Sequence, residues 1–302
     1  MGEGDWLDDQ WALGDTLSPL KVIAQSLSEL GIDLLLAGET GSGKDTLAQR
    51  IHNLSGRKGG FVAMNCAAIP ESLCESELFG VVSGAYTGAE RSRMGYIEAA
   101  QGGTLYLDEI DSMPLVLQPK LLRVLESRVL ERLGSTTPID LDICVIASAQ
   151  RPLDELVEQG TFRHDLYFRL NVLTLRLPPL RLQRERIPAL FERLVEDTAE
   201  QMGLEADVVD PIMSQVLLNH DWPGNIRELK SAAKRFVLKL PLLDDDDPGR
   251  DATTALKSQL RLIERVLIQE SLKRNKHCIS SVSRELDIPR RTLYHRMKAL
   301  DV

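Results

Sequence analysis

The feature that most constrains this chain is a glycine-rich loop between an apolar run and an amphipathic stretch. Leu34–Ala37 is a short aliphatic run typical of a buried strand, and a helical pattern over Lys44–Asn53 follows the loop. Glycines let backbone N–H groups surround an anion, and the helix N-terminus adds its dipole. This order predicts a P-loop for ATP, with Lys44 at the β- and γ-phosphates. The predicted nucleotide-binding residues of the loop are Gly38, Glu39, Thr40, Gly41, Ser42, Gly43, Lys44, Asp45 and Thr46.

The residue after the P-loop lysine departs from the usual pattern. P-loops ordinarily carry Ser or Thr at this position, and its hydroxyl group binds Mg²⁺. This chain has Asp45 instead. Two arrangements remain open: the carboxylate of Asp45 binds Mg²⁺ through a water molecule, or Thr46 takes over the role of the missing hydroxyl.

A second half of the site is predicted where an apolar run ends in two carboxylates, Asp108 and Glu109. At the end of a strand next to the P-loop strand, Asp108 would hold Mg²⁺ and Glu109 would orient the attacking water. An acidic pair at a strand end is common and weak as evidence by itself. Together with the P-loop it predicts ATP hydrolysis.

Strand-like and helix-like patterns alternate over about 240 residues. We expect buried parallel strands at Ile32–Ala37, Phe61–Met64, Thr104–Leu107 and Ile143–Ser148. Helices are expected at Lys44–Asn53, Leu115–Ser127 and Pro152–Gln159. This alternation predicts an α/β fold, a parallel sheet covered by helices on both faces. From about 184 to 239 the strand signals vanish, which predicts a lid of three to four helices.

The end of the chain is separated from this part by an acidic segment. Residues 241–255, PLLDDDDPGRDATTA, combine Pro, Gly and four consecutive Asp residues and predict a linker. The net charge of −9 argues against a nucleic-acid binder, but residues 255–300 hold 11 Lys/Arg against 4 Asp/Glu. Only this tail is therefore expected to meet a polyanion.

The tail has the pattern of a helix-turn-helix. Ile279–Leu286 and Arg290–Leu300 are helical, with a turn at Asp287–Pro289 between them. A preceding amphipathic helix, Ala255–Leu272, is expected to dimerise the module. An apolar stripe on the second helix leaves basic and polar residues for phosphates and base edges. The predicted DNA-contacting residues are Arg290, Arg291, Thr292, His295 and Arg296.

Composition excludes other classes of protein. No apolar run reaches the length of about 18 residues that a membrane span needs, and the acidic N-terminus lacks the layout of a signal peptide. The four cysteines show neither CxxC pairing nor metal-ligand spacing, so a reducing cytoplasm is expected.

At several motifs together the chain resembles a known family, the NtrC-type AAA+ enhancer-binding proteins that activate sigma-54 RNA polymerase. The resemblance covers roughly residues 14–240, continues in a Fis-like tail, and is most specific at GAYTGA. The motifs that carry it are GETGSGKD (38–45), FVAMNCAAI (61–69), ESELFG (75–80), GAYTGA (84–89), GGTLYLDEI (102–110), FRHDLYFRLNV (162–172) and WPGNIREL (222–229). The short length is similar to that of the Hrp-type activators of type III secretion genes.

This resemblance implies a domain division. A short tail (1–13) would precede an AAA+ α/β subdomain (14–183) and a helical lid subdomain (184–240). An acidic linker (241–254) would then lead to a Fis-like helix-turn-helix domain (255–302). The fold implied is an AAA+ P-loop ATPase, a parallel sheet flanked by helices plus a helical lid, with an all-α DNA-binding domain.

The resemblance also assigns roles to residues. Asn65 matches the switch asparagine that holds the catalytic glutamate, Glu109, until the nucleotide state changes. Arg163 and Arg169 match arginine fingers that reach the ATP of a neighbouring subunit, which implies a hexameric ring. Gln150 stands at the first sensor position, where many relatives have Asn, and Arg227 matches the sensor arginine of the lid. The family commonly has Glu at the position of Asp45.

The most specific motif would grip sigma-54. By resemblance the loop Gly84, Ala85, Tyr86, Thr87, Gly88 and Ala89 extends from the ring, and ATP hydrolysis moves it. The family usually has Phe where this chain has Tyr86, a change that keeps the ring and adds a hydroxyl group. From the residues alone, this segment would be interpreted as a turn.

The implied partners are sigma-54 RNA polymerase, double-stranded DNA at an upstream enhancer site, and further copies of the chain, with a closely similar paralogue as a possible ring member. About 13 residues precede the ATPase domain, too few for a receiver or sensor, so we expect control by abundance or by a separate regulatory protein in trans. Two alternatives remain: another AAA+ machine, such as a replication loader or an unfoldase with a DNA- or adaptor-binding tail, and a binding-only regulator with an inactive ATPase.

Overall fold

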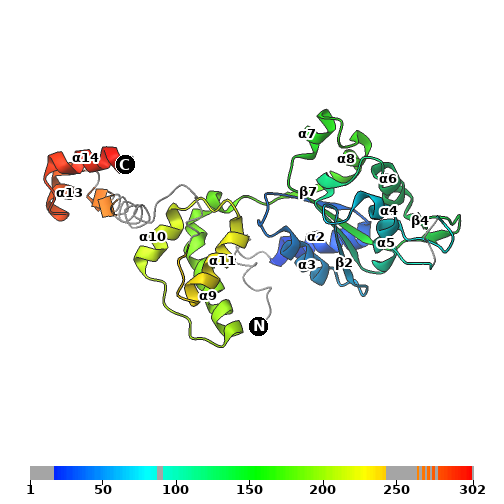
Figure 1. Cartoon of the computed structure of the whole chain (residues 1–302), viewed down its shortest axis with the longest axis horizontal. Helices are drawn as coiled ribbons and strands as arrows, with labels where there is room; N and C mark the ends of the chain where they lie inside the picture. Colours follow the sequence, from blue (N-terminus) through cyan, green and yellow to red (C-terminus); the bar gives the residue numbers. More distant parts are fainter. Residues whose placement is uncertain are drawn as a thin grey trace. The chain divides into compact units, whose positions relative to one another are not determined.

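The computed structural model describes residues 17–86, 91–242, 264, 267–268, 271–272, 274–275 and 278–300. The chain divides into two compact units (Figure 1). The first unit contains residues 1–183 and 223–228, and the second contains residues 184–222 and 229–302. The candidate nucleotide site lies in the first unit, and the helix-turn-helix belongs to the second.

The first unit contains a parallel sheet of five strands in the order β2-β3-β6-β1-β7. All four strands expected from the sequence are present, which confirms the α/β class. The edge strand β7 was not expected, because its residues are only partly buried and lack a continuous apolar run. The strands are β1 (Leu34–Ala37), β2 (Phe61–Asn65), β3 (Thr104–Asp108), β6 (Cys144–Ala149) and β7 (Leu173–Arg176).

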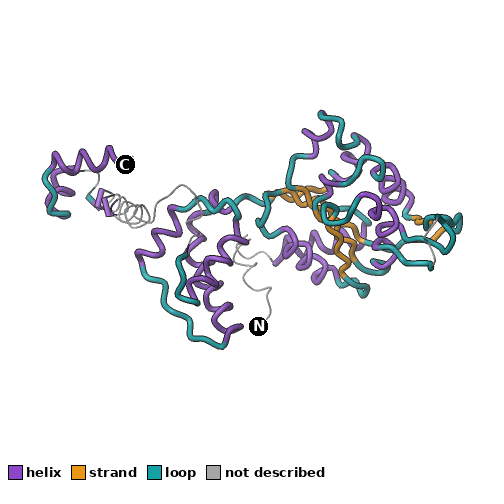
Figure 2. Tube along the Cα trace, in the orientation of Figure 1, coloured by secondary structure: helices purple, strands orange, loops and turns teal. Residues whose placement is uncertain are grey.

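Successive side chains of each strand point to opposite faces of the sheet, and each face has its own hydrophobic cluster. Leu34, Leu36 and Tyr106 belong to the cluster on the face covered by α2 and α3. Leu35 and Leu105 belong to the cluster on the other face, which α4 to α8 cover (Figures 1 and 2). This three-layer packing is the expected parallel sheet between helices.

The helices around the sheet differ in part from the expected ranges. The expected helix at residue 115 begins at Gln118, because a turn closes from Leu117 N–H to the Pro114 carbonyl. The helices α2, α4, α5 and α8 and the hairpin β4–β5 were not expected. The elements are α2 (Leu17–Leu30), α3 (Lys44–Ser55), α4 (Glu71–Phe79), α5 (Tyr96–Ala99), α6 (Gln118–Ser127), α7 (Leu153–Glu158), α8 (His164–Leu170), β4 (Val129–Glu131) and β5 (Pro138–Asp140).

The lid is helical, as the sequence predicts. Its helices are α9 (Ile187–Met202), α10 (Pro211–Asn219) and α11 (Asn225–Val237), the last of which begins within the first compact unit. Helix α10 starts at a cap, because the Asp210 carboxylate accepts a hydrogen bond of 2.6 Å from Met213 N–H. Trp222 is fully buried and donates its indole N–H to the Leu217 carbonyl at 2.8 Å.

The end of the chain forms a small helical cluster. Helices α13 (Ile279–Glu285) and α14 (Arg290–Leu300) pack Val282 and Leu293 against Ile268 and Leu272. Residues 243–254 of the predicted linker (241–254) and most of the predicted helix 255–272 lie outside the described residues. Within the described part of the chain, no helix is long and apolar enough to cross a membrane.

Candidate nucleotide-binding and hydrolysis site

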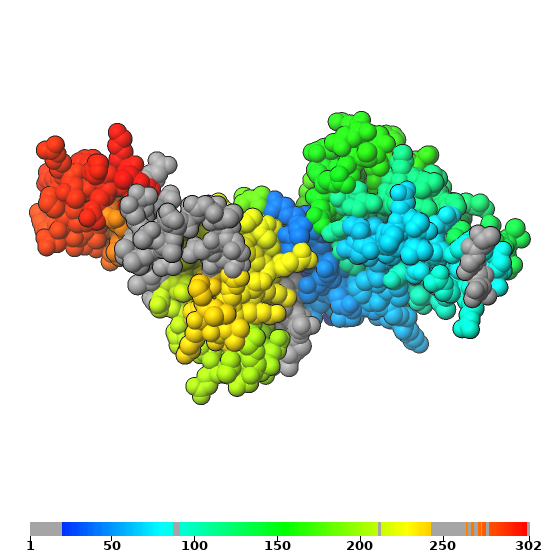
Figure 3. All heavy atoms as spheres, in the orientation of Figure 1, coloured from blue at the N-terminus to red at the C-terminus, as the bar shows by residue number. Residues whose placement is uncertain are grey.

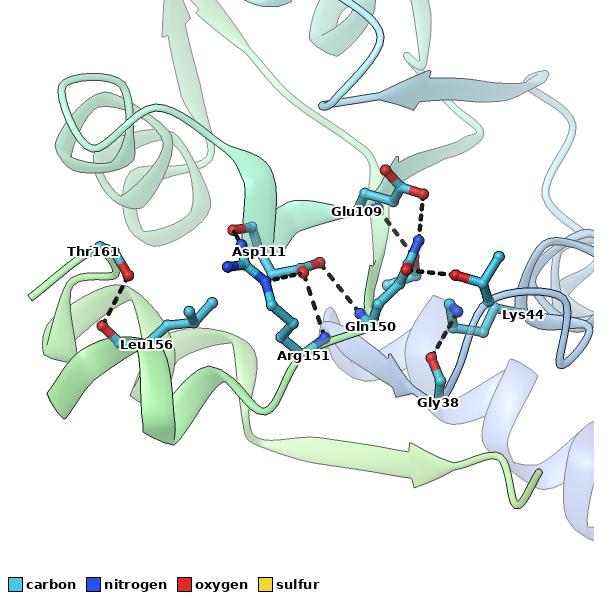
Figure 4. A network of polar contacts seen from close by, with 10 residues as sticks. Gly38, Lys44, Glu109, Asp111, Gln150, Arg151, Leu156 and Thr161 are labelled. Atoms are coloured by element: carbon cyan, nitrogen blue, oxygen red, sulfur yellow. Dashed lines mark hydrogen bonds and ion pairs between the residues drawn. The ribbon is translucent and has the colours of Figure 1, made fainter. Parts of the chain in front are cut away.

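The P-loop curls around its own lysine. Gly41 and Gly43 adopt left-handed backbone angles, with φ of 72° and 96°. Lys44 is buried, and its ammonium group donates a hydrogen bond of 2.8 Å to the Gly38 carbonyl (Figure 4). It donates another of 3.0 Å to the Glu39 carbonyl. Burial lowers the pKa of Lys44, while the nearby carboxylates of Asp108 and Asp45 act in the opposite direction.

The start of α11 contacts the P-loop directly. The Asn225 amide group donates to Glu39 at 3.2 Å and to the Thr40 carbonyl at 3.0 Å, and Ile226 N–H donates to the Gly41 carbonyl at 2.9 Å. A Cβ atom at Gly41 would lie 2.3 Å from the Gly224 carbonyl oxygen, so only glycine fits there. This contact places the segment that contains Arg227 beside the predicted phosphate cradle.

A second contact holds the loop through Glu39. Arg181 donates two hydrogen bonds to the Glu39 carboxylate, at 2.7 and 2.6 Å. These bonds, with a smaller contribution from Asn225, lower the pKa of Glu39 to about 2. Neither Arg181 nor Asn225 was predicted from the sequence. Asn225 lies inside the quoted motif WPGNIREL, which could have drawn attention to it, whereas Arg181 had no local signal.

Asp108 ends β3 with both carboxylate oxygens engaged. Its Oδ1 accepts hydrogen bonds from Ser148 at 2.5 Å and from the Tyr106 hydroxyl group at 3.1 Å. Its Oδ2 accepts one from the Asn65 amide group at 3.0 Å. Asn65 is the register partner of Asp108 on the neighbouring strand β2, and this pairing explains their contact.

In this structure the Glu109 carboxylate contacts Gln150, while Asn65 contacts Asp108, so the predicted switch role of Asn65 stays a prediction. Glu109 has a left-handed backbone (φ 54°) and its N–H donates to Ser148 at 3.1 Å, so the residue turns toward β6. The Gln150 amide group donates to the Glu109 carboxylate, and the Gln150 oxygen accepts a hydrogen bond of 2.5 Å from Thr40 (Figure 4). Gln150 therefore bridges the P-loop and the predicted catalytic glutamate. A cavity of about 350 Å³ lies beside Gly38 and Gln150.

Asp45 lies in the first turn of α3 and faces a tyrosine that the sequence did not single out. The Tyr106 hydroxyl group donates to Asp45 Oδ1 at 2.7 Å. Burial, assisted by the neighbouring Asp45 charge, raises the pKa of Tyr106, so the hydroxyl group keeps its proton. No hydrogen bond of Thr46 links it to this group among the described contacts.

The acidic groups fit a magnesium ion that arrives with a nucleotide. Mg²⁺ in such sites takes one or two carboxylates plus phosphate oxygens and water, not a cage of protein ligands. Among the described residues no three His, Cys, Asp or Glu side chains gather in such a cage. Asp108 stands near Lys44 with a carboxylate of fixed orientation, which suits this kind of metal site.

The two predicted finger arginines have different surroundings. Arg163 precedes α8 and donates two hydrogen bonds to Asp165, at 3.0 and 2.7 Å, in a pair whose side chains are each 44% exposed. Arg169 lies 2.7 Å from Asp33, whose side chain is fully buried and also pairs with Arg128 at 2.6 Å. Arg163 is exposed at the surface, whereas Arg169 is engaged by a buried carboxylate of the same chain.

The segment that leads into the predicted sigma-54 loop is hydrogen-bonded to its neighbours. Val81 pairs with Arg93 and Leu133, and residues 83, 84, 86 and 91–94 are exposed at the surface (cyan in Figure 3). Gly84 has φ 81°, and Tyr86 is 46% exposed. Thr87, Gly88 and Ala89 lie outside the described residues.

All five predicted DNA-contacting residues lie on one helix, α14, but one of them is engaged in an ion pair. Arg290, Arg291 and His295 are exposed, and Thr292 is partly buried. The Arg296 guanidinium group forms an ion pair with Glu264, so it is engaged within the module. Tyr294, which the sequence analysis did not name, is 58% exposed on the same helix.

Family models match three consecutive parts of the chain. A Sigma-54 interaction domain matches residues 14–176, an AAA+ ATPase lid domain matches 181–241, and a bacterial regulatory protein domain of the Fis family matches 259–300. These matches agree with the geometry of a P-loop site, a helical lid and a helix-turn-helix.

Curated relatives cover almost the whole chain. The pathogenicity locus probable regulatory protein HrpS of Pseudomonas savastanoi pv. phaseolicola is 68% identical over 94% of each chain. HrpR of Pseudomonas syringae pv. syringae is 61% identical over 93% of this chain and 90% of the relative. The crystal structure of NtrX from Brucella abortus in complex with ATP is 31% identical, with a TM-score of 0.67 over 100% of this chain and 69% of that chain. This chain therefore belongs to the sigma-54-dependent transcriptional activators that carry the Sigma-54 interaction domain, and it is similar to the Hrp regulators among them.

Proposed function

We propose that this protein hydrolyses ATP in a hexameric ring and uses the energy to remodel closed promoter complexes of sigma-54 RNA polymerase. The observation that carries the proposal is the meeting of Lys44, which follows β1, with Asp108 and Glu109 at the carboxyl end of β3. The two strands are not neighbours, contrary to the prediction from the sequence, because β6 lies between them. Membership of the sigma-54 activator family and the likeness to an ATP-bound NtrX structure support it.

Each residue of the site has a distinct task in this proposal. Lys44 binds the β- and γ-phosphates of ATP, and the backbone of the P-loop surrounds them. Asp108 holds Mg²⁺, which neutralises charge that develops on the phosphates. Glu109 orients the attacking water and accepts its proton, and Gln150 positions the Glu109 carboxylate.

Arg163 is the preferred finger of the proposed ring. A guanidinium group delivered to the γ-phosphate in the transition state accelerates hydrolysis by about 10³-fold or more. Arg163 is exposed and paired with an exposed carboxylate, a weak pairing that a phosphate can replace. The neighbouring subunit is a second copy or a closely similar paralogue.

The remaining parts deliver this activity to a promoter. The loop at Gly84–Ala89 contacts sigma-54, and α14 binds double-stranded DNA upstream of the promoter. The similarity to HrpS and HrpR supports pathogenicity genes, those of type III secretion, as the targets. Because the Fis-type domain meets the bacterial chromosome, we place the protein in the cytoplasm.

The proposal is tested by open-complex formation in vitro. Purified protein is added to sigma-54 holoenzyme on a DNA template that carries a sigma-54 promoter and an upstream site. Open complexes are expected with ATP and not with ADP. Open complexes that form equally well without hydrolysable nucleotide would support a binding-only regulator instead.

A further inference from the structure

Tyr106 is a buried tyrosine whose hydroxyl group faces two carboxylates. Its side chain lies in the middle of β3, on the face that α2 and α3 cover, with 2% exposure. The ring stacks on Phe61 with centroids 5.6 Å apart. The hydroxyl oxygen lies 2.7 Å from Asp45 Oδ1 and 3.1 Å from Asp108 Oδ1. A buried hydroxyl group is stable only when it is hydrogen-bonded, and here both acceptors belong to the candidate site.

We propose that Tyr106 is a positioning residue of the metal–nucleotide site, which ties the carboxylate of Asp45 to that of Asp108. Asp45 then anchors the hydroxyl group of Tyr106 and is not itself a metal ligand. The inference rests on the proposed role of Asp108 as the carboxylate that holds Mg²⁺.

The hydrogen bonds of Asp108 fix the direction of its carboxylate. They come from Asn65 on β2, Tyr106 within β3 and Ser148 on β6, so that three adjacent strands hold one side chain. An ionised carboxylate offers about four lone-pair sites. The three donors therefore leave about one lone-pair site of the carboxylate open, so that a cation can bind it from only one direction.

Such an arrangement suits Mg²⁺ in particular. Mg²⁺ demands near-ideal octahedral geometry and tolerates little displacement of its ligands. Residues that orient a metal ligand by hydrogen bonding contribute about 10- to 100-fold to metal affinity. Because Asn65 and Ser148 would still hold Asp108, we expect the lower end of this range for the loss of the Tyr106 hydroxyl group.

The role of Asp45 follows from the same geometry. The single hydroxyl hydrogen of Tyr106 is shared between two oxygens, and the shorter contact is to Asp45. Asp45 is thus linked to Asp108 through the hydroxyl group of Tyr106. A substitution of Asp45 must lose its effect on metal binding once the hydroxyl group of Tyr106 is gone.

The test measures nucleotide affinity and not turnover. Binding of a fluorescent ADP analogue to the full chain is titrated with saturating Mg²⁺ and again with EDTA. The variants are Tyr106→Phe, Asp45→Ala and the double variant. Tyr106→Phe keeps the ring on Phe61, and thermal melting checks that each variant folds. The matched control is Tyr96→Phe, because Tyr96 is partly buried against the opposite cluster of the sheet.

The expected result is a loss confined to the metal-dependent part of binding. Tyr106→Phe should bind the analogue in EDTA within about twofold of wild type, and the gain in affinity on adding Mg²⁺ should fall about tenfold. Asp45→Ala should weaken the Mg²⁺-dependent gain by itself and add nothing in the Tyr106→Phe background. Tyr96→Phe should behave as wild type.

Three results would overturn the inference. The first is an unchanged Mg²⁺-dependent gain in Tyr106→Phe, and the second is an equal loss with Mg²⁺ and with EDTA, which indicates a purely structural role. The third is an additive effect of Asp45→Ala in the double variant, which would make Asp45 a ligand in its own right. Wild-type protein that binds no nucleotide under either condition would instead refute the proposed function.

Discussion

Arg169 Nη1 lies 2.7 Å from Asp33 Oδ2 within one chain, and the Asp33 side chain is fully buried. Burial raises the pKa of Asp33, while Arg128 and Arg169 oppose that shift. A buried carboxylate needs such partners, and removing one of them destabilises the fold. The two arginines of the motif FRHDLYFRLNV are therefore separable by measurement.

Arg169→Ala should lower the free energy of unfolding by about 1–3 kcal/mol, since Asp33 keeps Arg128 but loses its second partner. Arg163→Ala should change it by less than about 0.5 kcal/mol, because its pairing with Asp165 is exposed. Urea denaturation measures both.

Mixing Arg163→Ala with Lys44→Ala subunits should restore part of the ATPase activity, since the Arg163→Ala subunit supplies the nucleotide pocket and the Lys44→Ala subunit supplies the finger. No recovery in rings shown to be mixed would count against a finger acting in trans.

Lys44→Ala and Glu109→Gln should fail at different steps. Lys44 contacts phosphate in the ground state, so its loss should abolish ATP binding. Glu109 acts on water, so the glutamine variant should retain ATP binding and lose hydrolysis. Equilibrium binding and phosphate release separate the two effects. Normal turnover in Lys44→Ala would remove the basis of the assignment.

Gln150→Ala and Asn65→Ala should change different kinetic constants. Gln150 holds the Glu109 carboxylate, so its removal should lower kcat by about tenfold or more, a part of the 10²–10⁴-fold that a positioned general base provides. Asn65 holds Asp108, so its removal should chiefly raise the KM for Mg²⁺–ATP. Steady-state kinetics over a range of Mg²⁺ concentrations distinguishes the two effects. A lower kcat in Asn65→Ala and a higher KM in Gln150→Ala would instead indicate that Asn65 is the partner of Glu109.

Tyr86→Ala and Thr87→Ala should separate hydrolysis from sigma-54 engagement. Tyr86 is exposed in a loop away from the hydrogen-bonded site, so ATPase activity should stay within about twofold of wild type. Trapping with sigma-54 in the presence of a transition-state analogue of ATP should be lost. Met94→Ala, at a residue that is 60% exposed beyond the loop, is the matched control. Capture of either loop variant by sigma-54 would show that the loop assignment is wrong.

Arg291→Ala and Arg296→Ala should affect DNA binding unequally. Loss of one phosphate contact at the exposed Arg291 should lower the slope of log affinity against log salt concentration by about 1. Arg296 is paired with Glu264, so its substitution should change the slope less. Binding measured at several salt concentrations gives both slopes. An equal loss for the two variants would mean that the Glu264 pair opens on DNA.

The local sequence by itself determined the parts of this protein whose chemistry is contained in one continuous segment. Gly41, Gly43 and Lys44 form the P-loop through their own backbone angles and the helix that follows. Aliphatic runs of the expected length became β1, β3 and β6, because a strand buried on both faces needs apolar residues throughout. The strand β7 escaped prediction because its residues are only partly buried and lack a continuous apolar run.

Tertiary structure decided which of these residues meet. Strand β6 lies between β1 and β3, so it brings Ser148 and Gln150 to Asp108 and Glu109, residues distant in the chain. No pattern within one segment encodes that strand order, and for this reason the sequence did not predict that Gln150 contacts Glu109 while Asn65 contacts Asp108. The same holds for Tyr106 with Asp45 and Arg169 with Asp33, since a side chain's partner depends on the elements packed against it.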